Sequence, residues 1–216
     1  MGKNVLVVGT GRFGRYTIET LNKLGHEILA VDQSEEKVDK VLPFVAGAEI
    51  GDSTDEEFLQ TLGIDDFDLC VVAIGDNFMA SLETASLLKH MGARKVVARA
   101  TSDLQERLLL RCGADEVVFP ERQMGRWTAI RFSADNIIDY IELADGYTIF
   151  EVEVPLAWMG KRIVDLDIRR NYDANILGVS ENGKMNMSIS AETVLNRGEK
   201  VLVLGPLEQM RRLFRL

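Results

Sequence analysis

The sequence has few of the residues that mark secreted, metal-binding or membrane-spanning proteins. It holds two cysteines and two histidines among 216 residues. Its longest apolar run, Leu69 to Ile74, is far shorter than the ~18 to 20 residues of a membrane-spanning helix. Cys70 lies in that run and Cys112 near the end of a helical pattern, so both are expected to be reduced thiols without a metal or redox role.

Basic residues do not predominate. Lys and Arg number 25 against 34 Asp and Glu, which gives a formal net charge of −9 and argues against a nucleic-acid partner, because phosphate contacts need a basic face. The first residues predict a strand rather than a charged and then apolar leader, so a cytoplasmic protein is expected. With 46% hydrophobic and 27% charged residues, the composition is that of an ordinary globular protein.

What the sequence does contain is a glycine-rich loop directly after an apolar strand. Val5 to Val8 run into Gly9, Gly11 and Gly14, the spacing of a dinucleotide-binding loop. In such loops the first glycine permits the turn, the second lets backbone N–H groups approach a pyrophosphate, and the third lets the next helix pack on the strand. A glycine turn in an unrelated α/β protein is the alternative. An acidic strand end, Asp32 in EILAVD, lies where a ribose-binding carboxylate is expected and favours the first interpretation.

Strand and helix patterns then alternate as far as residue 120. Strands are predicted near residues 4–8, 27–32, 45–49, 68–74, 95–100 and 116–119. Because parallel strands need crossover helices, this predicts an α/β fold with a Rossmann-like, doubly wound parallel sheet. Helix starts are predicted after Ser34 and after Thr54, the latter as a capping box with Glu57.

A second, small α+β domain is predicted after the sheet. Residues 1–135 are expected to form the nucleotide-binding domain, with a crossover helix or helix pair continuing to about 145 and packing on its own sheet or on another subunit. Residues 146–216 alternate with a period of two, have an Asn182-Gly183 hairpin signal, and end in a helical pattern. A domain this small is expected to dimerise.

An NAD(P)H-dependent oxidoreductase is the usual interpretation of such a loop, but hydride transfer needs a proton donor near the cofactor. His26 and His90 are better interpreted as turn or cap residues. Arg12, between the second and third glycines, could reach the terminal phosphate of a nucleotide and so favours ATP or ADP, although it could also be a solvated residue of the first helical turn.

The order of several segments resembles the regulator-of-potassium-conductance (RCK) family, the cytosolic subunits of bacterial Ktr and Trk potassium uptake systems. These segments are GTGRFG, AVD, GDST, VVAIGDNFMAS, VVARA and GADEVVFPERQMG, and the arginine in the glycine loop is more similar to the Ktr type. The resemblance covers nearly the whole chain. It implies a protein that is not an enzyme and that binds a nucleotide at the carboxyl ends of its strands.

The resemblance also implies roles for individual residues. Phosphates would be held by the glycine loop, the ribose by the end of the second strand, and the adenine by residues after the third, fourth and fifth strands. The implied nucleotide-binding residues are Gly9, Gly11, Arg12, Phe13, Gly14, Asp32, Gln33, Asp52, Ser53, Ala73, Ile74, Gly75, Arg99 and Glu121. Asp52 could instead cap the following helix.

Two further ligands follow only from the resemblance. Glu121 would face the nucleotide of an adjacent subunit and help to bind a divalent cation or Na⁺, although it could simply be a charge at a helix start. In the second domain Ile163, Arg169, Asn175 and Ile176 would bind cyclic di-AMP at a dimer seam, or the isoleucines could be ordinary core residues.

The function implied is that of a gating subunit. Homodimers would assemble into an octameric ring beneath a membrane potassium-translocating subunit of the Ktr or Trk type, at the inner face of the membrane. ATP and ADP would set the shape of the ring through contacts with Arg12 and Glu121. An NAD(H)-sensing regulator of the Trk type remains an alternative, because Asp32 cannot distinguish NAD from ATP.

Overall fold

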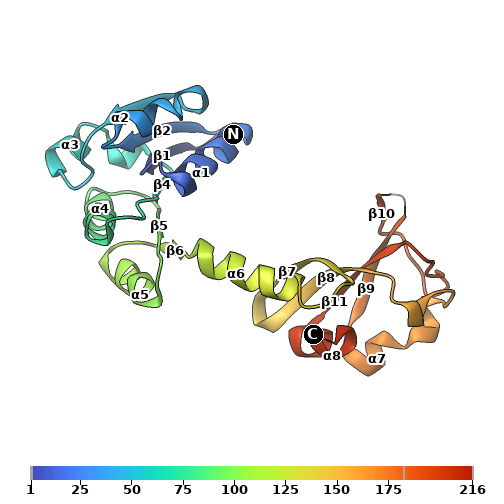
Figure 1. Ribbon diagram of the computed structural model, residues 1–216. Coiled ribbons are helices and arrows are strands. Elements are labelled where there is room, and N and C mark those ends of the chain that lie inside the picture. The colour runs from blue at the N-terminus through green and yellow to red at the C-terminus, as the bar shows by residue number, and fades with distance from the viewer. Residues whose placement is uncertain (1, 182, 216) are drawn as a thin grey trace. The chain divides into compact units, whose positions relative to one another are not determined.

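The computed structural model describes residues 2–181 and 183–215 and divides into two compact units, residues 1–122 and 123–216. Figure 1 traces the chain through the first unit, in blue to green, and then the second, in yellow to red. Among the described residues, no helix is both long enough and apolar enough to cross a bilayer. Asn182, half of the expected hairpin signal, lies outside the described residues.

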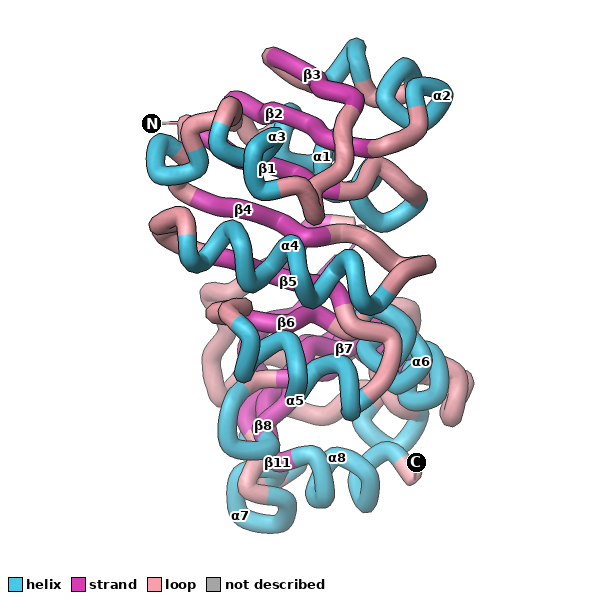
Figure 2. The backbone as a smooth tube through the Cα atoms, turned by 90° about the vertical axis from the view of Figure 1, so that its left-hand side faces the viewer, coloured by secondary structure: helices cyan, strands magenta, loops and turns pink. Residues whose placement is uncertain are grey.

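The first unit is built on a parallel sheet of six strands in the order β3-β2-β1-β4-β5-β6, which confirms the Rossmann-like prediction. Figure 2 shows these strands side by side, with the order reversing between β1 and β4. Their bounds are β1 Asn4–Val8, β2 Glu27–Asp32, β3 Gly47–Ile50, β4 Leu69–Val72, β5 Val96–Arg99 and β6 Glu116–Val118.

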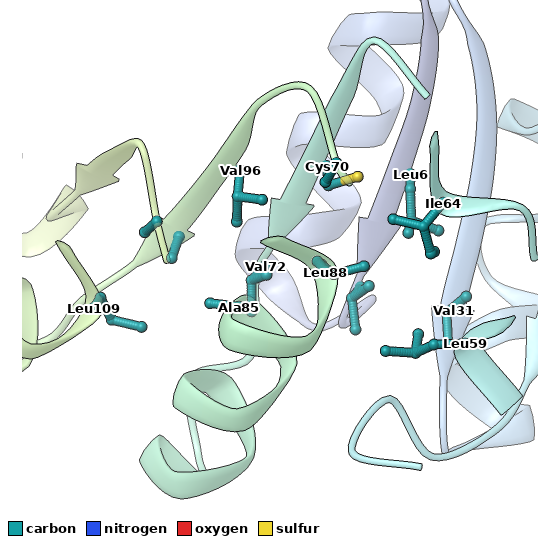
Figure 3. Packing of buried hydrophobic residues seen from close by; sticks show 14 of the residues in the cluster. Leu6, Val31, Leu59, Ile64, Cys70, Val72, Ala85, Leu88, Val96 and Leu109 are labelled. Atoms are coloured by element: carbon teal, nitrogen blue, oxygen red, sulfur yellow. The ribbon is translucent and has the colours of Figure 1, made fainter. Parts of the chain in front are cut away.

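Alternate residues of each strand face opposite layers of helices. Leu6 and Val8 point to the layer with α3, α4 and α5, whereas Val5 and Val7 point to the layer with α1. Figure 3 shows the first layer, where Leu6 packs among side chains of the neighbouring strands and helices. The helices are α1 Arg12–Lys23, α2 Glu35–Asp39, α3 Glu56–Gln60, α4 Phe78–His90 and α5 Asp103–Cys112, with short 3-10 turns at Leu42–Phe44 and Ile64–Asp66.

The start of α3 differs from the sequence prediction. Asp55, not Thr54, is the N-cap, and its carboxylate accepts hydrogen bonds from the backbone N–H groups of Glu57 at 2.9 Å and Phe58 at 3.4 Å. Thr54 instead donates its backbone N–H and hydroxyl to Asp52. Two adjacent capping residue types made the position ambiguous in the sequence. Ser34 does precede α2, although its side chain makes no capping hydrogen bond.

The predicted crossover helix is shorter than expected. Helix α6 spans Pro120–Arg131, and residues expected to continue it to about 145 form strand β7, Ile137–Glu142, after a short connection. Trp127 of α6 donates its indole N–H to Asp139 of this strand at 2.8 Å. Residues 137–142 therefore belong to the sheet of the second unit rather than to a helix.

The second unit contains a five-stranded antiparallel sheet in the order β10-β9-β11-β8-β7. Phe150, on β8, is fully buried, with Tyr140 and Phe214 at ring-centroid distances of 5.5 and 5.8 Å. The remaining elements are β8 Tyr147–Glu153, α7 Ile168–Tyr172, β9 Asn175–Glu181, β10 Lys184–Asn186, β11 Lys200–Pro206 and α8 Leu207–Phe214, with 3-10 turns at Ala144–Gly146, Leu156–Trp158 and Ile163–Leu166. This arrangement is the small α+β module that the period-two pattern predicts.

Candidate functional site

The glycine loop joins β1 to α1 and depends on close backbone contacts. Gly9 has a φ of +93°, which an L side chain rarely adopts, and its N–H donates to the carbonyl of Val31 at 2.7 Å. A Cβ on Gly14 would lie 1.9 Å from the carbonyl oxygen of Gly9, so only glycine lets α1 approach the loop this closely. A Cβ on Gly11 would meet nothing within 4 Å, so this glycine borders open space.

Asp32, at the end of β2, holds the loop in place. Its carboxylate accepts hydrogen bonds from the backbone N–H of Thr10 at 2.7 Å, the Thr10 hydroxyl at 3.1 Å and the backbone N–H of Ser34 at 2.9 Å. The side chain predicted to bind a ribose therefore also connects the glycine loop to the start of α2. Oδ2 accepts both bonds from Thr10, whereas Oδ1 accepts only the bond from Ser34 and has a further lone pair available to a ligand.

A cleft of about 770 Å³ opens at the carboxyl ends of the strands. This is where open α/β sheets bind ligands. Most of the residues predicted from the sequence line it. These are Gly9, Gly11, Arg12, Phe13, Asp32, Gln33, Ser53, Ala73, Ile74, Gly75, Arg99 and Glu121.

Two predicted residues do not line the cleft. Gly14 is turned toward Gly9, where it permits packing rather than contact with a ligand. Asp52 accepts two hydrogen bonds from Thr54, at 2.9 and 2.7 Å, and these hold the pKa of its carboxyl below the usual value. Its neighbour Ser53 does line the cleft, and the Ser53 hydroxyl lies 2.8 Å from that of Thr84 in the interior.

Arg99 connects three parts of the cleft. Its guanidinium donates to the carboxylate of Glu121 and lies 5.8 Å from the centroid of the Phe13 ring. A Cβ on Gly75 would lie 2.4 Å from Nη1 of Arg99, so the guanidinium packs directly against the Gly75 backbone. The Arg99 side chain is 19% exposed, and its Nε is buried without a hydrogen-bond partner. That N–H is a donor that a bound ligand could satisfy.

Glu121 lies in the first turn of α6 and is surrounded by positive charge. Its own backbone N–H, the guanidinium of Arg99 and the more distant charge of Arg12 together hold the pKa of its carboxyl below the usual value. Within the described residues, no group of three or more His, Cys, Asp or Glu side chains is arranged to hold a metal ion.

The cleft also includes residues that the sequence analysis did not single out. Tyr16 comes from the second turn of α1 and Lys37 from the first turn of α2, and Asp76, Asn77 and Ala80 come from the β4–α4 connection and the start of α4. Asn77 could have been found from its position, because it caps α4 by accepting the N–H of Ala80 at 3.1 Å. The remaining lining residues, Val8, Val31, Gly51 and Pro120, contribute at the strand ends.

The residues predicted to bind cyclic di-AMP are arranged in the second unit as follows. Nε of Arg169, in α7, donates to the Asn175 side-chain oxygen at 2.7 Å, at the start of β9. Ile163 and Ile176 are half-buried and pack against the hydrophobic core of this unit. The arginine and the asparagine are therefore adjacent, while the isoleucines also have a packing role.

Neither cysteine lies at the cleft. Burial raises the pKa of the Cys70 thiol to about 12, so it stays protonated, and Cys112 is a half-buried free thiol near the end of α5. His26 accepts the backbone N–H of Lys3 at 3.0 Å, in the turn before β2.

Comparison with known proteins identifies both units. Residues 5–120 match the TrkA-N domain family and residues 147–216 match the TrkA-C domain family. The Ktr system potassium uptake protein C of Bacillus subtilis is 35% identical over 212 residues, covering 98% of this chain and 96% of its own. The Ktr system potassium uptake protein A of the same organism is 34% identical, over 97% of this chain and 95% of its own.

Solved structures have the same fold. The GsuK RCK domain aligns with a TM-score of 0.69 at 21% identity, over 100% of this chain and 48% of its own, so this chain spans less than half of that protein. A GsuK channel solved with NAD aligns with a TM-score of 0.69 at 21% identity, over 99% of this chain and 39% of its own.

The two domain families together match most of the sequence, and the relatives have almost the same length as this chain. The chain belongs to the TrkA family of Ktr and Trk potassium uptake proteins and has the fold of an RCK domain.

Proposed function

We propose that this protein is a cytoplasmic regulatory subunit that binds ATP or ADP and thereby gates a potassium-translocating membrane protein. The observation that carries the proposal is the cleft, in which a glycine loop, Asp32 and Arg12 lie together at the strand ends. Support also comes from the relatives, which are named as Ktr system potassium uptake proteins. The protein acts by changing how subunits pack and catalyses no reaction.

Discrimination between the two nucleotides depends on charge. ATP and ADP differ by one phosphoryl group. A switch between two conformations of the protein therefore needs a side chain that contacts this group in only one of the two conformations. Arg12 is the first residue of α1, directly beside the phosphate-binding loop, and its charge acts on Glu121. A terminal phosphate that attracts Arg12 therefore also changes the electrostatic surroundings of Glu121.

The proposed assembly is a homodimer that forms a ring, an octamer, docked at the inner face of the membrane on a Ktr- or Trk-type translocating subunit. Glu121 of one chain would face the nucleotide of its neighbour, with a divalent cation or Na⁺ between carboxylate and phosphate. The ion would offset the repulsion between these two anions. Cyclic di-AMP would bind the second unit at Arg169 and Asn175, with Ile163 and Ile176 beside them.

Calorimetry on the full-length protein tests the proposal. We expect wild type to bind ATP and ADP with different affinities and the Arg12→Ala variant to lose about tenfold in ATP affinity, with a smaller change for ADP, as for removal of a charge-assisted hydrogen bond. The control is Arg15→Ala, which removes an α1 arginine that pairs with Glu19 at 2.8 Å. An unchanged ATP/ADP preference in Arg12→Ala contradicts the role given to this residue.

Mass spectrometry of nucleotides that co-purify with the protein identifies the ligand directly. We expect an adenine nucleotide in the purified protein, and restored potassium uptake when the chain is expressed with its membrane partner in a strain that lacks uptake systems. Turnover of NADH with a carbonyl substrate by a monomeric protein would contradict the proposal.

A further inference from the structure

We propose that Met185 and Met187 form a site of reversible oxidation, at which a peroxide converts the two thioethers to sulfoxides and thereby releases strand β10 from the second sheet. The inference goes beyond the proposed function, because both residues belong to the second unit and neither lines the nucleotide cleft. The modification it assigns is methionine sulfoxide, which reductases can reverse.

The two methionines lie at the edge of the second sheet. Met185 is the central residue of β10 and Met187 directly follows this strand. Strand β10 ends the strand order, beside β9 (Figure 1). Residues two apart on an extended chain point to the same face of a sheet, so the two thioethers lie on one face.

Both thioethers cover Gly178 of β9. A Cβ at Gly178 would lie 2.6 Å from Sδ of Met187, 3.2 Å from Sδ of Met185 and 3.0 Å from the backbone oxygen of Asn186. Gly178 is buried, whereas Met185 and Met187 are 41% and 57% exposed. The glycine therefore leaves a hollow that the two sulfurs fill, while their side chains remain open to a small oxidant in solution.

Oxidation at each sulfur is a transfer of one oxygen atom. A sulfur lone pair attacks an oxygen of hydrogen peroxide, an S–O bond forms, the O–O bond breaks, and water leaves after proton transfer. The thioether is oxidised and the peroxide is reduced, by two electrons each. The product is a polar group in place of an apolar one.

A sulfoxide fits the hollow poorly. Its oxygen is a hydrogen-bond acceptor, and the polar atom that meets this position, the backbone oxygen of Asn186, is an acceptor as well. The oxidised side chain should therefore turn out into water, where its oxygen is hydrated. Gly178 then loses the two apolar groups that cover it.

Strand β10 depends on these contacts because it is short and exposed. It has three residues, all of them exposed, and among the described strands it pairs only with β9. The pairs join Met185 to Ser180 and Asn186 to Val179, with Lys184 opposite Glu181. Loss of the thioether packing should therefore open the β9–β10 pairing as a local event, and leave β9 as an unpaired edge.

The experiment measures amide hydrogen exchange at residues 179–181 and 184–186 of the full-length protein, before and after treatment with hydrogen peroxide. We expect exchange there to become at least about tenfold faster after oxidation and to return to its first rate after incubation with methionine sulfoxide reductases. The double variant Met185→Leu, Met187→Leu conserves volume and should keep slow exchange in peroxide. Met185→Gln, Met187→Gln places polar groups in the hollow and should exchange rapidly without peroxide.

The matched control is Met124→Leu. Met124, in α6, is 55% exposed, so peroxide reaches it as well, but its replacement should not protect the β9–β10 pairing. The inference is overturned if oxidised wild type exchanges at the untreated rate. It is also overturned if peroxide accelerates exchange in the leucine double variant as much as in wild type.

Discussion

Two glycines of the same loop differ in what they contribute, and substitutions should separate the contributions. Gly14→Ala places a Cβ 1.9 Å from the carbonyl oxygen of Gly9 and should destabilise the protein by more than about 2 kcal/mol, because the helix must move off the strand. Gly11→Ala meets no neighbouring atom, so it should leave stability within about 1 kcal/mol of wild type but weaken nucleotide binding. Urea unfolding and calorimetry measure the two effects.

A third glycine supplies the control. Gly125 lies inside α6, where a Cβ would meet nothing within 4 Å, so Gly125→Ala should stabilise the protein by about 0.5 to 1 kcal/mol through helix propensity. If Gly14→Ala were as harmless as Gly125→Ala in urea unfolding, the close packing of α1 on the loop would be contradicted.

The carboxylate of Asp115 makes stability depend on pH. It accepts Lys89 Nζ at 2.7 Å and the backbone N–H of Val96 at 2.7 Å, and the bond from Lys89 above all holds its pKa below the usual 3.8. A carboxyl with a lowered folded-state pKa stabilises the protein above its unfolded-state pKa, and the contribution is lost as the pH falls through the folded-state pKa.

The free energy of unfolding of Asp115→Asn should therefore be lower than that of wild type at pH 7, and it should decrease less as the pH is lowered. The expected loss is about 0.5 to 1 kcal/mol, since the side chain is one-third exposed and solvent screens the pair. Between pH 7 and about pH 3, the difference between variant and wild type should shrink. Urea unfolding at several pH values measures this. Asp39→Asn, at an exposed carboxylate, is the control. If the difference in unfolding free energy between Asp115→Asn and wild type stayed constant with pH, the role given to Asp115 would be contradicted.

At the scale of a helix, the cap of α3 can be tested directly. Asp55→Ala removes an acceptor for two backbone N–H groups and should cost about 1 kcal/mol of folding free energy. Thr54→Ala removes only one hydroxyl donor to Asp52 and should cost less than about 0.5 kcal/mol. Thermal unfolding of both variants gives the comparison. A larger effect of Thr54→Ala would restore the sequence-based assignment of the cap.

The strands and their ends could be predicted from the sequence because apolar runs in a parallel sheet are nearly continuous and the turns between elements hold glycines. Ala73, directly after the end of β4, lies at the cleft for this reason. Side-chain direction within a turn could not be predicted. Asp52 and Ser53 are adjacent, yet only Ser53 lines the cleft, since Thr54 holds the carboxylate of Asp52 away from it.

Strand β7 was predicted as helix for a structural reason. Its pairing with β8 shifts register between Ile137 and Asp139, and this irregularity breaks the alternation of buried and exposed residues. The buried residues Ile137 and Tyr140 are consequently three apart, which is the spacing of a helix face. A period-two pattern was therefore absent from the sequence even though the backbone is a strand.

In the molecule as a whole, each unit has its own core, so the two should lose stability separately. Leu6 is fully buried in the core of the first unit and Phe150 in that of the second. Leu6→Ala should cost about 2 to 5 kcal/mol and Phe150→Ala about 3 to 5 kcal/mol. In differential scanning calorimetry we expect two transitions, with Leu6→Ala lowering one midpoint and Phe150→Ala the other.

Ligand addition then identifies which transition belongs to the nucleotide site. A ligand that binds only the folded form stabilises the unit that holds it, so ADP should raise the transition lowered by Leu6→Ala and have little effect on the one lowered by Phe150→Ala. The ADP-dependent shift should persist in Phe150→Ala, because the whole cleft is lined by residues of the first unit. A single transition that both substitutions and ADP move together would instead mean that the units unfold as one, and that nucleotide binding is coupled energetically to the core around Phe150.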